Sequence, residues 1–196
     1  MQERLDARRA RILSAARRLI ARGGFRAAPM AAVANAARLS TGAVYRFFPS
    51  KTQLFTEVLA AAVAHEIAIL QSITRTASPV RQRLQRAVEA FARRGLAGRH
   101  LAYAFIAEPI DGEIDAARLA CRRQFSAVFE ALLREGVERD ELPPQDVAVA
   151  AACIVGAFTE ALVGAIAPAA RVPQPARREQ LVGSISRFCL HAVSGR

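Results

Sequence analysis

Hydrophobic residues recur every three or four positions along most of the chain, which is the period of an amphipathic helix. In the first quarter this pattern predicts two helices separated by Gly23-Gly24, residues that readily end a helix. Their apolar positions are Leu5, Ile12, Ala16, Leu19 and Ile20, and then Met30, Val33, Ala34 and Ala37. Phe25 is placed to fold back onto the first helix, and Pro29 suits the start of the second. Both helices therefore contribute walls to a small core.

A third short helix is expected from Ser40 onward. The side-chain oxygens of Ser40 and Thr41 can cap its start, and Pro49 disfavours helical geometry in the residue before it, which ends the helix. Ser50 can then cap the next helix. Only residues 38–39 separate the second and third helices, and two short helices joined so tightly make a helix-turn-helix.

The remaining three quarters of the chain keep the helical period and contain no strand pattern of useful length. Six further helices are expected, at about 50–74, 79–95, 98–108, 114–135, 147–167 and 176–193. The sequence therefore predicts an all-α protein. We expect a helix-turn-helix DNA-binding domain over residues 1–50 and a C-terminal helical domain over residues 51–196.

The segment 147–167 is apolar on every side except at Thr159 and Glu160. It is long enough to span a bilayer. It is also rich in alanine, carries a glutamate and has no aromatic belt, so we expect no membrane span. A helix that is apolar all round must otherwise be buried against another surface.

The last two helices, 147–167 and 176–193, predict a symmetric homodimer interface in which four helices meet across a two-fold axis. The first offers a nearly flat stripe of small side chains, and the second has one apolar side. These positions are Val149, Cys153, Ala157, Ala161 and Ala165, and then Leu181, Ile185, Phe188 and Ala192. The alternative is that both helices only complete the core of their own subunit.

Positive charge is concentrated at the N-terminal end of the chain. Of the net charge of +11, most lies in residues 1–51, which hold eleven Lys and Arg against two acidic residues. Residues 52–196 hold seventeen against fifteen. Such asymmetry indicates a polyanionic partner for the basic part.

The sequence lacks the cysteine spacings and motifs that are typical of metal sites, redox sites and enzymes. Cys121, Cys153 and Cys189 lack the paired spacing of zinc or redox sites and lie in apolar stretches, so we expect buried, reduced thiols. No metal-ligand spacing, Gly-rich phosphate loop or nucleophile elbow occurs, so we expect neither an enzyme nor a bound cofactor. With no signal peptide recognised, a cytoplasmic location is expected.

The outward positions around the third helix carry hydroxyls, cations and a glycine, which suit a phosphate backbone and the edge of a DNA groove. Arg46 is the best candidate for reading a base, with a phosphate contact as the alternative. Tyr45 suits a phosphate contact, with packing in the small core as its alternative. Lys51 stands in the first turn of a helix, where the macrodipole disfavours a cation unless a phosphate binds there. The expected DNA-binding residues are Ser40, Thr41, Gly42, Ala43, Tyr45, Arg46 and Lys51.

Two motifs, ILSAARRLIARGGF and MAAVANAARLSTGAVYRFFPSKTQLF, resemble the TetR (tetracycline repressor) family of bacterial regulators. The resemblance implies a homodimer that represses transcription and leaves a palindromic operator when a small molecule binds. It also implies that Tyr45 and Lys51 hold phosphates while residues 41–43 and Arg46 face the groove. Two positions depart from the family pattern. Ala28 stands where Thr or Ser usually caps the second helix, and Arg38 stands where a turn glycine is usual.

The C-terminal domain holds enough bulky side chains to line an apolar effector pocket. Arg118 interrupts an apolar stripe, so it faces either an acidic ligand or a structural partner, Asp115 or Glu108. The expected effector residues are Phe91, Tyr103, Phe105, Arg118, Cys121, Phe125, Phe158 and Leu162. Plain core packing is the alternative for most of them. If that alternative holds, the protein is a helix-turn-helix DNA-binding protein without a small-molecule effector.

Overall fold

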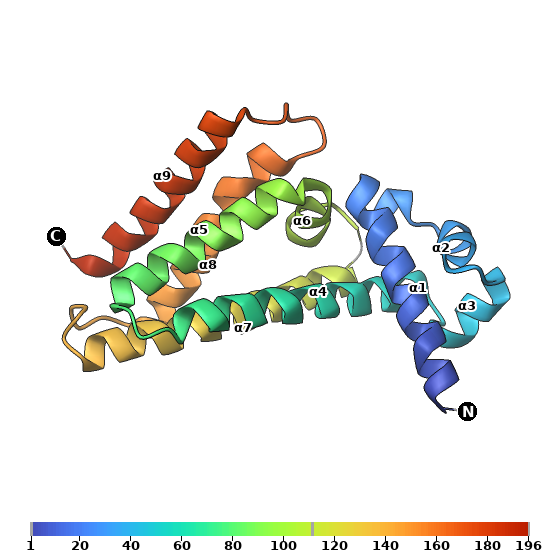
Figure 1. The fold of residues 1–196 in the computed structure, drawn as a ribbon, viewed down its shortest axis with the longest axis horizontal. Coiled ribbons are helices and arrows are strands. Elements are labelled where there is room, and N and C mark those ends of the chain that lie inside the picture. The colour runs from blue at the N-terminus through green and yellow to red at the C-terminus, as the bar shows by residue number, and fades with distance from the viewer. Residues whose placement is uncertain (1, 111, 196) are drawn as a thin grey trace. The chain divides into compact units, whose positions relative to one another are not determined.

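The computed structural model describes residues 2–110 and 112–195 (Figure 1). Met1, Asp111 and Arg196 belong to the two expected domains and lie outside the described residues. Over the described part, the chain forms nine α-helices, one short 3₁₀ helix and no strand, which confirms the predicted all-α class. The elements are α1 (Gln2–Gly23), η1 (Phe25–Ala27), α2 (Met30–Ala37), α3 (Thr41–Phe47), α4 (Lys51–Thr74), α5 (Val80–Ala97), α6 (Arg99–Ile106), α7 (Gly112–Glu138), α8 (Val147–Ile166) and α9 (Pro175–Ser194).

The helices group into two compact units. Unit 1 comprises the described part of residues 1–62 and 98–118, and therefore holds α1 to α3, the first half of α4, α6 and the start of α7. Unit 2 comprises the described part of residues 63–97 and 119–196, with the second half of α4, α5, most of α7, α8 and α9.

The core of unit 1 forms where the apolar sides of α1, α2, α3 and α4 meet. Ile12, Val33, Val44 and Leu54, one from each helix, are fully buried. Phe25 is also buried, and its ring centroid lies 4.6 Å from that of Phe55, which confirms that it folds back onto the core. Burying a side chain of this size contributes about 1.5–3 kcal/mol. This core holds α3 at the surface of unit 1.

The tight turn between α2 and α3 depends on a left-handed residue. Arg38, the C-cap of α2, has φ 56° and ψ 50°. Its amide donates to the carbonyl of Asn35 at 3.1 Å, and the amide of Leu39 donates to the carbonyl of Ala34 at 3.0 Å. These bonds satisfy carbonyls at the helix end. The turn therefore needs a positive φ at a position where an L side chain is strained.

Replacing Arg38 by glycine should raise the free energy of unfolding by about 1 kcal/mol, because glycine adopts this conformation without the steric cost. Urea denaturation followed by circular dichroism measures the change. Arg17→Gly, in the regular part of α1, is the control and should lower the free energy of unfolding by about 1 kcal/mol. A lower free energy of unfolding in Arg38→Gly would show that the left-handed conformation of Arg38 is not strained.

Unit 2 is built around the mutual packing of α5, α8 and α9, which lie side by side in Figure 1. Asp146 caps α8, because its carboxylate accepts from the amides of Ala148 and Val149 at 3.1 Å each. Aromatic rings fill the interior, with the centroid of Phe158 lying 4.5 Å from that of Phe91. The cap fixes the start of α8, and the rings fix which side of α8 faces inward.

The predicted apolar side of α9 is divided between the interior of unit 2 and the surface. Ile185 is buried as expected, but Leu181 is half-buried and Phe188 is 63% exposed. The face that packs into unit 2 consists of Val182, Ile185, Ser186, Cys189 and Val193. The helix carries apolar residues in two directions, so its sequence pattern alone does not tell which direction is the subunit's own core. The second direction leaves Phe188 on the surface.

A similar division occurs on α8. Its buried face consists of Ala151, Ile154, Val155, Phe158, Thr159, Leu162 and Ile166. Val149, which is 57% exposed, and Cys153 lie on the opposite side. Gly156 and Gly164 also face open space, because a Cβ added at either would meet nothing within 4 Å. The expectation that all three cysteines are buried is therefore wrong for Cys153. The stripe of small residues faces outward.

The other two cysteines are buried, free thiols, as predicted. Burial raises the pKa of Cys189 to about 11 and raises the pKa of Cys121 as well. Both thiols therefore stay protonated and unreactive near neutral pH.

Two helices, α4 and α8, are long and apolar enough to cross a membrane by length and composition alone. The core helix of a water-soluble protein passes the same test. In α8, the bulky residues Ile154, Phe158 and Leu162 are buried within unit 2. We therefore interpret α8 as a core helix, which agrees with the sequence-based expectation.

Candidate nucleic-acid interface

The helix α3 is positioned by its cap and by the residues it buries. The hydroxyl of Ser40 accepts from the amide of Ala43 at 3.2 Å, so the predicted N-cap is confirmed. Val44 and the C-cap residue Phe48 are fully buried. Because these two side chains point into the core, the opposite side of α3 faces away from it.

The outward side of α3 carries the residues expected to bind DNA. Thr41, Gly42 and Arg46 are exposed, and Tyr45 is 46% exposed, which argues against its core-packing alternative. Ala43 is half-buried. A Cβ added at Gly42 would meet nothing within 4 Å, so the fold itself does not require a glycine there. Close approach by an external partner is a physical reason for a residue without a side chain.

Lys51 lies beside this surface, at the start of α4. The hydroxyl of Ser50 accepts from the amide of Gln53 at 3.0 Å, which confirms the predicted cap. The ammonium of Lys51 is 5.1 Å from the centroid of the Phe55 ring, a cation–π distance. The lysine is exposed, so its charge and the helix N-terminus together offer a site for a phosphate.

The start of α2 differs from the family pattern in the way the sequence indicated. Its N-cap is Pro29, and no side chain caps the helix. Ala28 is fully buried. The helix therefore begins without the hydroxyl that the resemblance would place there.

The expected effector residues fall into both units. In unit 2, Phe91, Phe125 and Phe158 pack together, with the Phe91 centroid 5.6 Å from that of Phe125 and 4.5 Å from that of Phe158. Leu162 is fully buried and Cys121 is buried. These five residues therefore form part of the core of unit 2.

The other three expected effector residues lie in unit 1. Tyr103 is half-buried on α6, and Phe105 packs with its centroid 6.0 Å from that of Phe25. Arg118 is buried, and its guanidinium donates to Asp115 Oδ1 at 2.8 Å, to the Ala104 carbonyl at 2.5 Å and to the Glu108 carbonyl at 2.6 Å. The structural pairing of Arg118 with Asp115, left open by the sequence, is confirmed.

Glu108 has a different partner from the one considered in the sequence. Its carboxylate is buried and accepts from the amide of Phe25 at 3.0 Å. The neighbouring Gly24 has φ 73°, and a Cβ there would lie 2.6 Å from the same carboxylate oxygen. Glycine is therefore required at this position both for its backbone conformation and for space. Residues 25 and 108 are too far apart in the chain for local patterns to reveal this contact.

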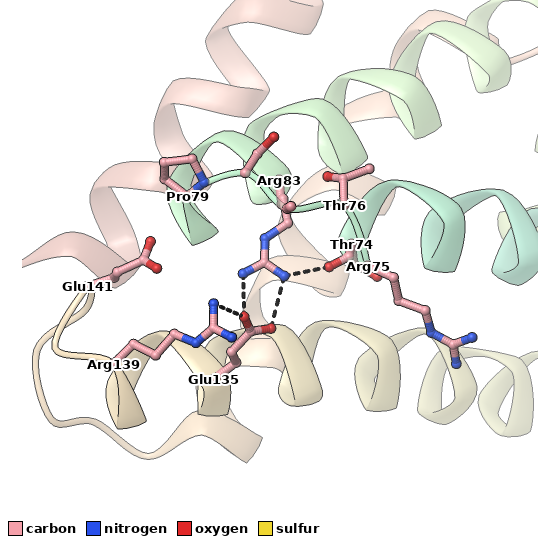
Figure 2. Close-up of a pocket in the computed structure, with 10 residues that line it drawn as sticks. Thr74, Arg75, Thr76, Pro79, Arg83, Glu135, Arg139 and Glu141 are labelled. Atoms are coloured by element: carbon pink, nitrogen blue, oxygen red, sulfur yellow. Dashed lines mark hydrogen bonds and ion pairs between the residues drawn. The ribbon is translucent and has the colours of Figure 1, made fainter.

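A polar pocket of about 700 Å³ opens at one end of unit 2, lined by none of the predicted effector residues (Figure 2). Arg83 is almost fully buried there and clamps Glu135 with two bonds, Nη1 to Oε2 at 2.9 Å and Nη2 to Oε1 at 2.7 Å. Arg83 Nη1 also donates to the Thr74 carbonyl at 2.7 Å, and Arg139 pairs with Glu135 at 2.7 Å. Arg83 therefore ties the end of α4 to α5 and α7.

The clamp should make the stability of the protein depend on pH. The hydrogen bond from Arg83 is the main cause that lowers the pKa of Glu135 from its ordinary value of 4.5. A lowered folded-state pKa means that the pair contributes its full stability above the ordinary value and loses it as the pH falls through the lower, folded-state value. Glu135→Gln should therefore be less stable than the parent protein at pH 7, and the difference should shrink on acidification below about pH 4.

Urea unfolding curves at neutral and acid pH measure this difference. Glu138→Gln, which removes an exposed carboxylate from the same helix, is the matched control and should show no such trend. A deficit in Glu135→Gln that stays constant with pH would contradict the proposed origin of the effect.

A helix-turn-helix with an exposed recognition surface and a neighbouring basic helix start defines a DNA-binding transcriptional regulator. Residues 12–58 match the family described as bacterial regulatory proteins, tetR family. Residues 77–162 match the tetracyclin repressor-like C-terminal domain. The protein belongs to the TetR family of transcriptional regulators, as its sequence motifs indicated, and it is a regulator and not an enzyme.

Curated relatives include both an activator and a repressor. The chain is 37% identical over 86 residues to the transcriptional activator FasR of Mycolicibacterium smegmatis, a match that covers 44% of this chain and 39% of FasR. It is 47% identical over 53 residues to the transcriptional repressor KstR of Rhodococcus jostii, which covers 27% of this chain and 25% of KstR. These matches span less than half of the relatives' own length.

The fold is also that of solved regulators. The transcriptional regulator FadR of Bacillus subtilis, in complex with stearoyl-CoA, superposes with a TM-score of 0.75 at 18% identity. The match covers 95% of this chain and 98% of that chain. At this level of identity the likeness concerns the fold alone.

Proposed function

We propose that the protein is a ligand-responsive repressor that binds a palindromic operator as a homodimer and leaves it when a small molecule binds. The DNA-binding part of this proposal is supported by the exposed outward surface of α3 and by Lys51, which lies beside it. In this proposal Tyr45 and Lys51 hold phosphates, Ser40 caps α3, and Thr41, Gly42, Ala43 and Arg46 face the groove. Residues 1–50 are then the DNA-binding domain, and residues 51–196 are the effector-binding and dimerisation domain.

Selection of bound duplexes from a random pool tests this proposal. A helix-turn-helix reads only a few base pairs, so a dimer should recover two inverted half-sites with centres about 34 Å apart. Affinity should fall steeply with added salt, because binding releases counterions from the phosphates. Recovery of a single half-site, or of no common sequence, would contradict the proposal.

The homodimer proposal is supported by the outward faces of α8 and α9. Val149 and Phe188 are more than half exposed, and the small exposed residues Cys153, Gly156 and Gly164 follow Val149 along α8. Exposed apolar residues on two adjacent helices are typical of an interface between subunits. Sedimentation velocity of the purified chain measures the oligomeric state, and a monomer at micromolar concentration would contradict the proposal. We place this regulator in the cytoplasm, where its operator lies.

For the effector we propose a small molecule whose apolar part enters unit 2 among Phe91, Phe125, Phe158 and Leu162, with Cys121 nearby. Long-chain acyl-CoA thioesters are the first compounds to test, because the structurally similar FadR of Bacillus subtilis was solved with stearoyl-CoA. A ligand that binds only the folded state raises the thermal midpoint, and the same compound should release operator DNA.

The second candidate function is a helix-turn-helix DNA-binding protein without a small-molecule effector. The packing of Phe91, Phe125 and Phe158 favours it, because the Phe91 centroid lies only 5.6 Å from that of Phe125 and 4.5 Å from that of Phe158, within the core of unit 2. A panel of stearoyl-CoA, palmitoyl-CoA and the free fatty acids discriminates the two functions. If none of them shifts the thermal midpoint or weakens operator binding, this second function is favoured.

A further inference from the structure

The N-terminal part of α1 extends beyond the core of unit 1. Ile12 is the first α1 residue in that core, and residues 3–11 contain no buried residue. We call residues 3–11 the α1 overhang. At about 1.5 Å per residue, it is about 13 Å long. No residue of the overhang is buried in the core of unit 1, so core packing does not explain why α1 extends this far.

The α1 overhang is nevertheless held beside the recognition helix. The guanidinium of Arg9 lies 5.0 Å from the centroid of the Phe48 ring and pairs with Glu57 on α4. Phe48 is the C-cap of α3. In Figure 1 the first turns of α1 run past the α3 side of unit 1. The overhang is therefore anchored to the C-terminal end of α3 and to α4.

Three arginines occupy one side of the α1 overhang. Arg4, Arg8 and Arg11 are separated by four and three residues, which places them on the same helix face. All three are exposed, and none of their side chains makes a hydrogen bond or ion pair within residues 2–110 and 112–195. Like charges at this spacing repel one another, and the positive end of the helix dipole lies at the same end of α1. The protein by itself therefore keeps three cations where they are electrostatically unfavourable.

We propose that the α1 overhang is a second DNA contact, in which Arg4, Arg8 and Arg11 bind backbone phosphates that flank the half-site of α3. This inference rests on the proposed DNA-binding function and adds residues to it. A bound polyanion would offset the repulsion among the three arginines. It would also be attracted to the positive end of the helix dipole. The arginines span about 10 Å of helix, comparable to the rise of three base pairs at about 3.4 Å each. Phosphate contacts strengthen binding without selecting a base sequence.

The test compares two triple variants of the full chain with the same change in charge. The first is Arg4→Gln/Arg8→Gln/Arg11→Gln in the overhang. The control is Arg81→Gln/Arg122→Gln/Arg123→Gln, which removes three exposed arginines from unit 2. Fluorescence anisotropy gives the affinity of each for the selected operator duplex at several salt concentrations.

Each lost phosphate contact reduces the slope of log affinity against log salt by about 0.9, so losing up to six contacts in a dimer should reduce it by up to about 5. At low salt the overhang variant should bind at least about tenfold more weakly, with unchanged base preference, and the control should match the parent protein. The parent should also lose affinity when about five flanking base pairs are trimmed from each side, whereas the overhang variant should not.

A third variant, Arg4→Lys/Arg8→Lys/Arg11→Lys, keeps the charges and should restore the salt slope, which excludes an effect of altered helix formation. An unchanged slope in the glutamine variant, or an equal loss in the control, would overturn the inference while leaving the proposed function intact. If the parent protein binds no duplex at all, the proposed function fails first, so the two failures are distinguishable.

Discussion

Replacing Phe188 by glutamate should convert the protein from a dimer to a monomer and lower its affinity for the operator on the order of 100-fold. Phe188 is 63% exposed, so the substitution places a charge on the surface of the subunit and not in its core. In the proposed dimer the same position is buried twice, once from each subunit, and each phenylalanine contributes about 1.5–3 kcal/mol by leaving water. A buried, unpaired carboxylate opposes association still more strongly.

The loss of DNA affinity follows from the geometry of two half-sites. A monomer presents one recognition helix, whereas the specific complex requires two that are held about 34 Å apart. Sedimentation velocity measures the subunit mass, and anisotropy measures operator binding. Leu119→Glu is the matched control, because Leu119 is 54% exposed on α7 and lies outside the proposed interface. A dimeric Phe188→Glu protein with parental affinity would exclude this interface.

Replacing Arg46 and Lys51 separately by alanine should weaken DNA binding in two different ways. Arg46→Ala should lose about 1–3 kcal/mol on the operator and relax the preference at one base pair, because a bidentate contact to guanine is lost. Lys51→Ala should weaken binding to all sequences alike and reduce the salt dependence, because it removes a phosphate contact. Both side chains are exposed, so both variants should still fold, and Lys51→Ala should lose at most about 1 kcal/mol of stability with its contact to Phe55.

Competition binding with the operator, with single-base-pair variants of it and with random duplex distinguishes the two effects. Arg38→Ala, which removes a nearby exposed cation in the turn before α3, is the control for charge alone. If Arg46→Ala and Lys51→Ala lose the same affinity on operator and random DNA, Arg46 contacts phosphate and not a base.

Local signals were sufficient to predict the helices and the helix-turn-helix. The caps at Ser40 and Ser50 act within three residues of themselves, and the glycines at 23–24 end α1 where expected. Arg38, which stands where the family usually has a turn glycine, has the positive φ that such a glycine adopts easily. In each case the interacting groups are neighbours in the chain.

Contacts between distant segments were not foreseeable from local patterns. The carboxylate of Glu108 bonds the amide of Phe25, and Arg83 clamps Glu135 from another helix. Neither pair has a spacing that a helix period would detect. Whether the phenylalanines line a pocket or form a core likewise depends on how closely α5, α7 and α8 approach one another, and periodicity carries no information about that distance.

The amino-acid sequence was enough to establish the succession of helices, the capped recognition helix and the basic N-terminal quarter, because caps, breakers and charge act over a few residues. The fold was needed to decide which face of α9 is inside, which leaves Phe188 exposed, and to show that Cys153 lies on the surface. It was also needed to reveal that residues 3–11 extend past the core. Burial is a property of packed neighbours, and an apolar residue has the same place in the helical period whether its neighbour is its own subunit, a second copy or solvent.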